Sequence, residues 1–243
     1  MALAQLGLVV HPRRDIAGPL DSIAAWGSRN GVAIGQVAIP GQARRVAELV
    51  EVESCDLLVA VGGDGTTLAA LHAAAPASLP VLGVACGSVG VLTSMHADGL
   101  VAGLDQVAAG SWIRRPLPGL EVATVADRVG VAINDFAVVR SGIGQVIAAI
   151  TVDGELYART AGDGVVVASQ LGSSAYTMAA GGPSCRRGLG AWSSRRWPPT
   201  AESLPRWSSG RIAGWDWRWS RATEASAASS TVRNRNGGSR PSR

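Results

Sequence analysis

Residues 57–67 read LLVAVGGDGTT, and this stretch decides the fold. Its first five residues form a short apolar run that ends abruptly at Gly62, and an alanine- and leucine-rich segment follows over residues 68–75. This order predicts a buried strand, a tight turn and the first turn of a helix. Gly62, Gly63 and Gly65 leave the turn without side-chain bulk, so a ligand can contact the backbone there.

The chemistry of this turn points to a phosphate site that also holds an acid. Free N–H groups at the start of a helix favour an anion, and a phosphate chain suits them. Asp64 lies in the same turn, where a carboxylate repels phosphate unless it handles a proton or a metal. The alternative is an ordinary turn, because Asp-Gly pairs are common in turns. The stretch alone leaves both interpretations open.

The flanking sequence predicts alternating strands and helices. We expect further strands at residues 3–10, 32–39 and 80–85, and helices at 16–30, 42–52 and 97–110. Near-continuous apolar strands in such an alternation predict an α/β fold with a doubly wound parallel sheet. Ligands bind such sheets at the carboxyl ends of the strands, where the turn at residues 62–66 and a second glycine loop at 87–93 both fall.

A change of pattern near residue 112 indicates a second domain. From residue 120 the spacing becomes strand after strand, and a short helix follows at 172–180. The expected strands are residues 120–126, 129–140, 146–153, 155–160 and 164–169, with a hairpin turn at Asp153-Gly154. The prediction is an α/β nucleotide-binding domain over residues 1–112, an incomplete β-rich domain over 113–183 and a tail over 184–243.

The tail differs sharply from the rest of the chain in composition and charge. Residues 1–183 hold 10 Arg against 15 acidic residues, and residues 184–243 hold 12 Arg against 3. The net charge is therefore −5 before residue 184 and +9 from there on. The tail has six of the eight tryptophans and no apolar period, so we expect it to be disordered. Because the basic balance comes from the tail alone, it does not predict a nucleic-acid partner.

Several classes of protein are excluded by what the sequence lacks. All 22 basic residues are arginines, and without lysine there is no Walker P-loop, protein-kinase site or Schiff base. No apolar run reaches the roughly 18 residues of a membrane span. Three scattered cysteines predict neither a disulfide framework nor a metal cluster, so we expect a cytoplasmic protein. The three histidines share no ligand spacing and are given no role.

Several motifs together resemble the NAD kinase family. They are GGDGT at 62–66, Asn134-Asp135, VDGE at 152–155, Gly-Asp-Gly at 162–164, LGSSAY at 171–176 and AGGP at 180–183. Their order and spacing are similar to those of the family over roughly residues 3–183, and residues 87–93 resemble its second glycine loop. No single motif carries the resemblance, because each has an ordinary structural interpretation.

The resemblance implies phosphorylation of NAD on the 2′-hydroxyl of its adenosine ribose, which gives NADP. It implies ATP or polyphosphate as donor, a divalent metal (Mg²⁺) bound mainly through the nucleotide, and a homo-oligomer without a membrane partner. Asp64 is then the catalytic base that accepts the ribose proton, since phosphoryl transfer otherwise needs mostly positioning and charge stabilisation. Gly62, Gly63, Gly65 and Thr66 shape the phosphate cradle.

The nucleotide-binding residues of the second domain also follow from the resemblance. Asn134 and Asp135 are expected to grip the adenosine moiety, although such a pair is ordinarily found at a strand edge. Asp163 and the segment 174–176 are expected to line the NAD pocket, including that of a neighbouring subunit. Ser173 or Ser174 has a simpler interpretation as a helix cap, and Tyr176 as a packing residue. The full set adds Gln145, Gly172, Ser173, Ser174, Ala175 and Tyr176.

The sequence departs from the family pattern in four places. Residues 169–171 read SQL where the family usually has Thr-Pro-Thr, Ala179 replaces a serine, and Gln145 stands where a basic residue is frequent. After residue 183 nothing resembles the strands that complete the family's second domain, and the segment looks like translation in a wrong reading frame. The competing interpretations are a lipid or diacylglycerol-type kinase with the same glycine cradle, and an inactive chain or a nucleic-acid binder that uses the Arg/Trp tail.

Overall fold

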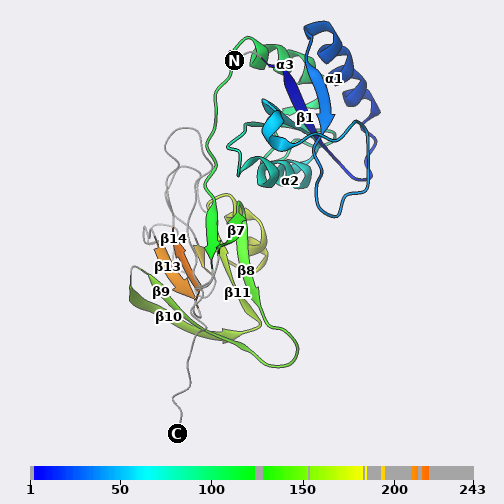
Figure 1. Ribbon diagram of the computed structural model, residues 1–243. Helices are drawn as coiled ribbons and strands as arrows, with labels where there is room; N and C mark the ends of the chain where they lie inside the picture. The colour runs from blue at the N-terminus through cyan, green and yellow to red at the C-terminus, as the bar shows by residue number, and fades with distance from the viewer. Residues whose placement is uncertain are drawn as a thin grey trace. The chain divides into compact units, whose positions relative to one another are not determined.

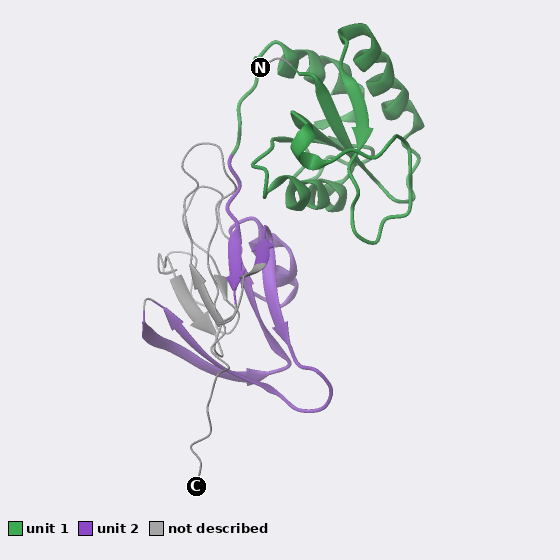
Figure 2. Ribbon diagram, viewed as in Figure 1, with its two compact units in different colours: residues 1–115 green, residues 116–243 purple. Residues whose placement is uncertain are grey.

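The computed structural model describes residues 3–123, 128–152, 154–182 and 184, with three short strands at 193–194, 209–212 and 215–218. The chain divides into two compact units, Met1–Arg115 and Pro116–Arg243 (Figure 2). Asp153, where a hairpin turn was expected, lies outside the described residues. The domain boundaries expected at residues 112 and 183 stay predictions.

The first unit is built on a five-stranded parallel sheet in the order β2-β1-β3-β4-β5 (Figure 1). Every neighbouring pair is parallel, which confirms the predicted sheet. The central pair joins Val10 of β1 to Val61 of β3, so these two strands end side by side. The strands are β1 (Gln5–Val10), β2 (Ala33–Gln36), β3 (Leu57–Gly62), β4 (Val81–Ala85) and β5 (Met95–His96).

Helices cover both faces of this sheet. Helices α1 (Ala17–Asn30) and α3 (Leu100–Ala108) share one hydrophobic cluster with Val59 of β3, and α2 (Asp64–Ala74) shares another with Leu58 (Figure 1). Because alternate residues of β3 face opposite layers and both layers are apolar, the strand is buried at every position. The doubly wound arrangement is therefore confirmed. Short 3₁₀ turns precede β3 (Val52–Ser54) and α3 (Ala97–Gly99).

One buried tryptophan joins the two helices on the first face. Trp26 of α1 is fully buried, and its Nε1–H donates to Asp105 Oδ1 of α3 at 2.7 Å. The hydrogen bond gives the ring's polar atom a partner inside the core. Helix α1 then ends at Gly31, whose φ of 66° is the left-handed cap that favours glycine.

The helix expected at residues 42–52 is wrong. This segment runs alongside β2, where the Gln36 N–H donates to the Glu48 carbonyl at 2.7 Å and the Val50 N–H donates to the Gln36 carbonyl at 3.0 Å. Val46 and Val50 still pack against the core, whereas Leu49 is exposed, and a Cβ at Gly35 would lie 2.4 Å from Val50. The backbone groups find partners on the open edge of β2 instead of within a helix, so tertiary pairing overrides the helical period.

The second unit is β-rich, as predicted. Its antiparallel strands form a six-stranded sheet in the order β10-β9-β13-β14-β6-β7 and a three-stranded sheet in the order β12-β11-β8. A 3₁₀ turn (Gly172–Ser174) and the short helix α4 (Tyr176–Ala179) follow β11. The first six strands are β6 (Leu120–Ala123), β7 (Arg128–Ala132), β8 (Asp135–Val139), β9 (Val146–Val152), β10 (Glu155–Gly162) and β11 (Gly164–Ala168).

The strand expected over residues 129–140 is in fact two strands. Beyond β7 the ladder stops at Ile133 and Asn134, whose carbonyls accept from the hydroxyl and the N–H of Ser169, at 2.6 and 2.8 Å. The chain then enters β8, which pairs with β11 in the other sheet. This change of sheet places Asn134 and Asp135 at a junction.

Three short strands lie within the predicted tail. They are β12 (Ser193–Ser194), β13 (Ser209–Ile212) and β14 (Trp215–Arg218), and the last two form an antiparallel pair that lies between β9 and β6. Nearly all other tail residues lie outside the described part of the chain. The expected disorder of residues 184–243 and their origin in a wrong reading frame stay predictions. No described helix combines the length and the apolar character that crossing a bilayer requires.

We predict that Trp26→Ala lowers the free energy of unfolding by about 3–5 kcal/mol, because it leaves a cavity in the core and removes the partner of Asp105. Urea unfolding followed by circular dichroism measures the change. Ile113→Ala is the matched control, because this side chain is 93% exposed and its loss should change stability by less than about 0.5 kcal/mol. Equal effects of the two substitutions would contradict the role assigned to Trp26.

Candidate functional site

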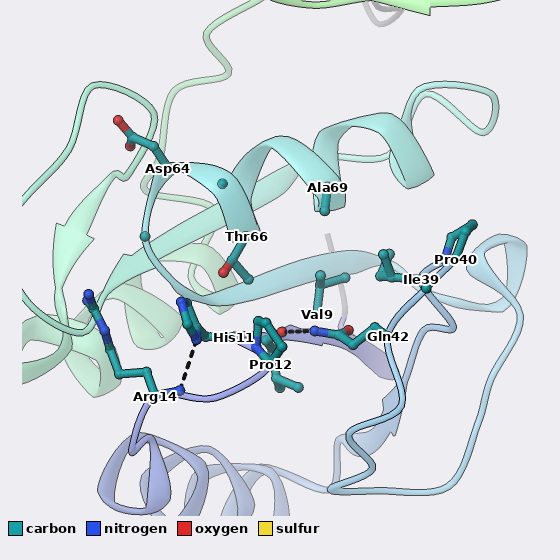
Figure 3. Close-up of a pocket in the computed structure, with 14 residues that line it drawn as sticks. Val9, His11, Pro12, Arg14, Ile39, Pro40, Gln42, Asp64, Thr66 and Ala69 are labelled. Atoms are coloured by element: carbon teal, nitrogen blue, oxygen red, sulfur yellow. Dashed lines mark hydrogen bonds between the residues drawn. The ribbon is translucent and has the colours of Figure 1, made fainter.

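An open pocket of about 560 Å³ lies in the first unit, where β1 and β3 end (Figure 3). Three segments form it: the end of β1 with the loop that follows, the loop after β2, and the first turns of α2. This is the carboxyl edge of the parallel sheet, where ligands bind in such folds. The lining residues are Val9, Val10, His11, Pro12, Arg14, Ile39, Pro40, Gly41, Gln42, Gly63, Asp64, Gly65, Thr66 and Ala69.

The end of β3, the start of α2 and the loop after β1 approach one another closely beside this pocket. A Cβ at Gly62 would lie 2.3 Å from Thr66 Oγ1 and 3.1 Å from His11 Cβ. The N–H and the hydroxyl of Thr67 both donate to the Gly63 carbonyl, at 2.9 and 3.1 Å, and start the helix. Glycine at position 62 therefore lets α2 begin directly over the ends of the two strands.

The Asp64 side chain is held by the second glycine loop. Its Oδ2 accepts from the Val91 N–H and its Oδ1 from the Leu92 N–H, both at 2.9 Å. A Cβ at Gly90 would lie 2.1 Å from Oδ1, so only glycine lets this loop come so close to the carboxylate. Figure 3 shows the carboxylate pointing away from His11 and Thr66. Two motifs far apart in the sequence thus meet at the start of α2.

The structure adds His11 and Arg14, in the loop after β1, and Arg44, in the segment after β2, to the surroundings of the predicted site. His11 Nδ1 accepts from the N–H groups of Arg13 and Arg14, at 3.1 and 2.9 Å. Arg14 Nη1 donates to the Cys86 carbonyl at 2.8 Å, and Arg44 Nη1 donates to the carbonyls of His11 and Arg14. Sequence reasoning gave His11 no role, although its position directly after a predicted strand was a usable signal.

In the second unit, the structure brings Asn134 and Asp135 against the segment 172–176. Asp135 Oδ2 accepts from the Tyr176 N–H at 3.2 Å. A Cβ at Gly172 would lie 1.9 Å from the Asn134 carbonyl oxygen, so the two segments are in direct backbone contact. Asn134 Oδ1 is buried and has no hydrogen-bond partner among the described residues. The cluster therefore holds a polar atom that a bound group with a hydrogen-bond donor would satisfy.

The side chains in this cluster differ from their simplest interpretations. Ser173 and Ser174 donate to the carbonyls of residues 170 and 171, at 2.7 and 3.2 Å, and neither short helix has a side-chain cap. Tyr176 is 74% exposed, so it is not a packing residue within the described chain. Burial raises the pKa of Asp135, and the hydrogen bond from the Tyr176 N–H partly offsets this shift.

Asp163 and Gln145 lie at the other end of the β8–β11 ladder. Asp163 directly precedes β11, whereas Ala168 at the far end of that strand pairs with Asp135. The five residue steps from Asp163 to Ala168 span about 17 Å along an antiparallel strand. Gln145 directly precedes Val146, which pairs with Gly162, so it lies near Asp163. Asp163 Oδ1 forms an ion pair with Arg140 Nε at 2.8 Å. Within one chain, these two residues are not brought to the Asn134 cluster.

Comparison with known proteins identifies the family. Residues 7–112, which contain the pocket, Asp64 and the second glycine loop, match the model of the ATP-NAD kinase N-terminal domain. Residues 7–112 therefore belong to the family of the ATP-NAD kinase N-terminal domain. The resemblance found in the sequence is confirmed.

Curated relatives agree with this assignment. The chain is 37% identical to the NAD kinase of Symbiobacterium thermophilum over 133 residues, which are 53% of this chain and 47% of that protein. It is also 37% identical to the NAD kinase of Nocardia farcinica over 152 residues, 59% of this chain and 46% of that one. The chain spans about half the length of the curated relatives it matches.

Two crystal structures share the fold. Yeast NADH kinase complexed with NADH aligns with a TM-score of 0.70 at 18% identity, over 100% of this chain and 91% of that one. An NAD kinase from Archaeoglobus fulgidus in complex with ATP aligns with a TM-score of 0.65 at 22% identity, over 96% of this chain and 94% of that one.

Among the described residues, no group of three or more His, Cys, Asp or Glu side chains is placed to hold a metal ion. The expected Mg²⁺ stays a prediction.

The raised pKa of Asp135 predicts how stability depends on pH. A folded carboxyl with a raised pKa keeps its proton to higher pH than the unfolded one, so its contribution to stability falls as the pH rises through that window. We expect Asp135→Asn, which is uncharged, to raise the melting temperature at about pH 7. This gain should disappear below the ordinary carboxyl pKa of about 3.9.

Melting curves across this pH range test the prediction. Glu155→Gln is the matched control, because it removes an exposed carboxylate from β10 of the same unit and should leave the curve unchanged. A gain for Asp135→Asn that is equal at all pH values would rule out a charge effect.

Proposed function

We propose that this chain is a phosphotransferase of the NAD kinase type. It transfers the terminal phosphoryl group of ATP, or of polyphosphate, to the 2′-hydroxyl of the adenosine ribose of NAD and so forms NADP. The observation that supports this proposal is the position of the Asp64 carboxylate and its two hydrogen bonds. The carboxylate stands on the first residue of α2, at the rim of an open pocket, and two backbone N–H groups hold it.

Asp64 acts as the general base in this proposal. It accepts the proton of the ribose hydroxyl as the oxygen attacks the phosphorus, which typically contributes about 10²- to 10⁴-fold to the rate. The N–H groups of Val91 and Leu92 fix the orientation of both carboxylate oxygens. Phosphoryl transfer depends mainly on positioning, so a fixed carboxylate serves it better than a mobile one.

The phosphates of the donor occupy the pocket beside Asp64. Gly63, Gly65 and Thr66 supply the start of α2, whose N–H groups and dipole favour an anion. The Archaeoglobus structure in complex with ATP supports a nucleotide donor. Mg²⁺ carried on these phosphates would neutralise part of their charge.

NAD is bound by the polar cluster of the second unit. We propose that the unpartnered Asn134 Oδ1 and the Asp135 carboxylate hold the adenosine moiety, with residues 172–176 as the neighbouring wall. Asp163 and Gln145 lie too far along the ladder to join them within one chain, so they would reach a shared pocket only from a second copy. A cytoplasmic homo-oligomer is the form that we propose.

A lipid or diacylglycerol-type kinase remains the competing activity, because it would use the same glycine cradle. Incubation of the purified chain with Mg²⁺ and either ATP or polyphosphate, in the presence of NAD, NADH or diacylglycerol, separates the two. We expect NADP to form from NAD. Phosphorylation of the lipid alone would overturn the proposal, and no product from any acceptor would identify an inactive chain.

We predict that Asp64→Asn lowers kcat at least 100-fold, because the amide cannot accept the ribose proton. The melting temperature should change little, since the amide oxygen still accepts one of the two loop N–H groups. Steady-state NADP formation and thermal unfolding measure both effects. Asp21→Asn is the control, because it neutralises an exposed carboxylate on α1 and should leave kcat unchanged. Retained turnover in Asp64→Asn would show that Asp64 is not the base.

We also predict that Gly90→Ala lowers kcat about tenfold or more while the KM for ATP changes little. The new Cβ would meet the Asp64 carboxylate, so the base moves while the phosphate pocket stays intact. Gly99→Ala is the control, because a Cβ at that position meets nothing within 4 Å. An unchanged kcat in Gly90→Ala would mean that the loop does not position Asp64.

A further inference from the structure

We propose that His11 binds the polyphosphate chain of the phosphoryl donor through its Nε2–H group. This inference rests on the proposed function and assigns a residue to its donor site. Two features carry it: the fixed orientation of the imidazole, and its position in the pocket opposite a buried hydroxyl.

The backbone fixes which nitrogen of His11 faces the pocket as a donor. The lone pair of Nδ1 accepts two N–H groups, those of Arg13 at 3.1 Å and Arg14 at 2.9 Å. In the neutral ring the hydrogen then resides on Nε2, since one nitrogen donates and the other accepts. No described residue is recorded as a partner of Nε2. The Nε2–H group of His11 is therefore held in a fixed direction and is available to donate a hydrogen bond to a ligand.

A hydroxyl group faces the same space from the other wall. Thr66 is 7% exposed and lines the pocket, and its hydroxyl has no recorded partner among the described residues. Figure 3 shows the Thr66 side chain directed toward His11 across the end of β3. The two side chains meet over Gly62, where a Cβ would collide with Thr66 and press on His11. A donor pair of this kind suits a ligand with several oxygen acceptors.

The charges around the pocket favour an anionic ligand. Arg14 lines it, and Arg44 braces the loop by donating to the carbonyls of His11 and Arg14. The nearby carboxylate of Asp64 is turned to the second glycine loop. Because the chain contains no lysine, the donors available to phosphate oxygens here are an imidazole, guanidinium groups, a hydroxyl and the N–H groups that begin α2.

The same chemistry would recognise two sources of phosphate. A nucleoside triphosphate and an inorganic polyphosphate both present a chain of anionic oxygens, and His11 contacts that chain in either case. Measurements with ATP and with inorganic tripolyphosphate therefore distinguish the sources. Equal affinity of the wild-type chain for both identifies the phosphate chain as the recognised part, and tighter binding of ATP adds a contribution from the nucleoside.

His11→Asn tests the proposal without removing the loop contact. The Asn side-chain oxygen can accept the N–H groups two and three residues ahead, as Nδ1 does, but it cannot reach into the pocket as Nε2 does. His96→Asn is the matched control. The His96 ring also contacts a residue two positions ahead, since its Nδ1 lies 3.0 Å from Asp98 Oδ2 and 3.5 Å from the Asp98 N–H nitrogen, and it does not line the pocket.

Isothermal titration of the full-length variants with ATP and with tripolyphosphate gives the dissociation constants. We expect His11→Asn to weaken binding of both about tenfold, which equals about 1.4 kcal/mol, and to leave the KM for NAD unchanged. His96→Asn should bind as the wild type does. Thermal unfolding checks that each variant is folded.

Three results would overturn the proposal. They are wild-type affinity in His11→Asn, equal weakening in His96→Asn, and a wild-type chain that binds neither ligand. If the expected binding pattern appears but no NADP forms, the kinase proposal fails while the phosphate-binding role of His11 stands. The two proposals are therefore tested separately.

Discussion

The missing side chain at Gly62 is the constraint on which the site depends. The first turn of α2 passes over the end of β3 so closely that a Cβ there would lie 2.3 Å from Thr66 Oγ1. His11, at the end of β1, approaches the same point from the other side. A larger residue would push the helix away from the strands and separate the two walls of the pocket. The absence of a side chain at Gly62 therefore sets the distance between the hydrogen-bond donors at the start of α2 and those of the loop after β1.

Much of the first unit could be predicted because its signals are local. The apolar run of β3, the glycines that follow it and the alanine-rich start of α2 are adjacent in the sequence, so a short window contains the whole strand–turn–helix. Gly31 ends α1 in the left-handed conformation for the same kind of reason. Contact between Asp64 and the loop at Gly90 was not visible in the sequence, although both motifs were. Their meeting depends on β3 and β4 being neighbours.

The errors and omissions arise where distant partners decide the local structure. Residues 42–52 have the apolar period of a helix. Their backbone groups nevertheless bond to Gln36 on the open edge of β2, and this tertiary pairing prevents a helix from forming. The strand expected at 129–140 is divided because Ser169 takes the carbonyls of its middle residues. His11 was overlooked because its importance comes from β1 lying beside β3, and strand order cannot be read from a single segment.

The position of Asp64 resolves a conflict that the sequence alone poses. A carboxylate about 4 Å from a phosphate charge is repelled by about 4 kcal/mol at the effective dielectric of a protein surface. In this fold the Asp64 carboxylate points away from His11 and Thr66 (Figure 3), so a phosphate bound beside those two residues would lie on the other side of the same helix turn. The N–H groups of Val91 and Leu92 hold the carboxylate on the side of the second glycine loop, whereas the pocket opens toward His11 and Thr66. One helix terminus can therefore serve a bound anion and a proton acceptor together, provided that both glycine positions, 62 and 90, stay free of side chains.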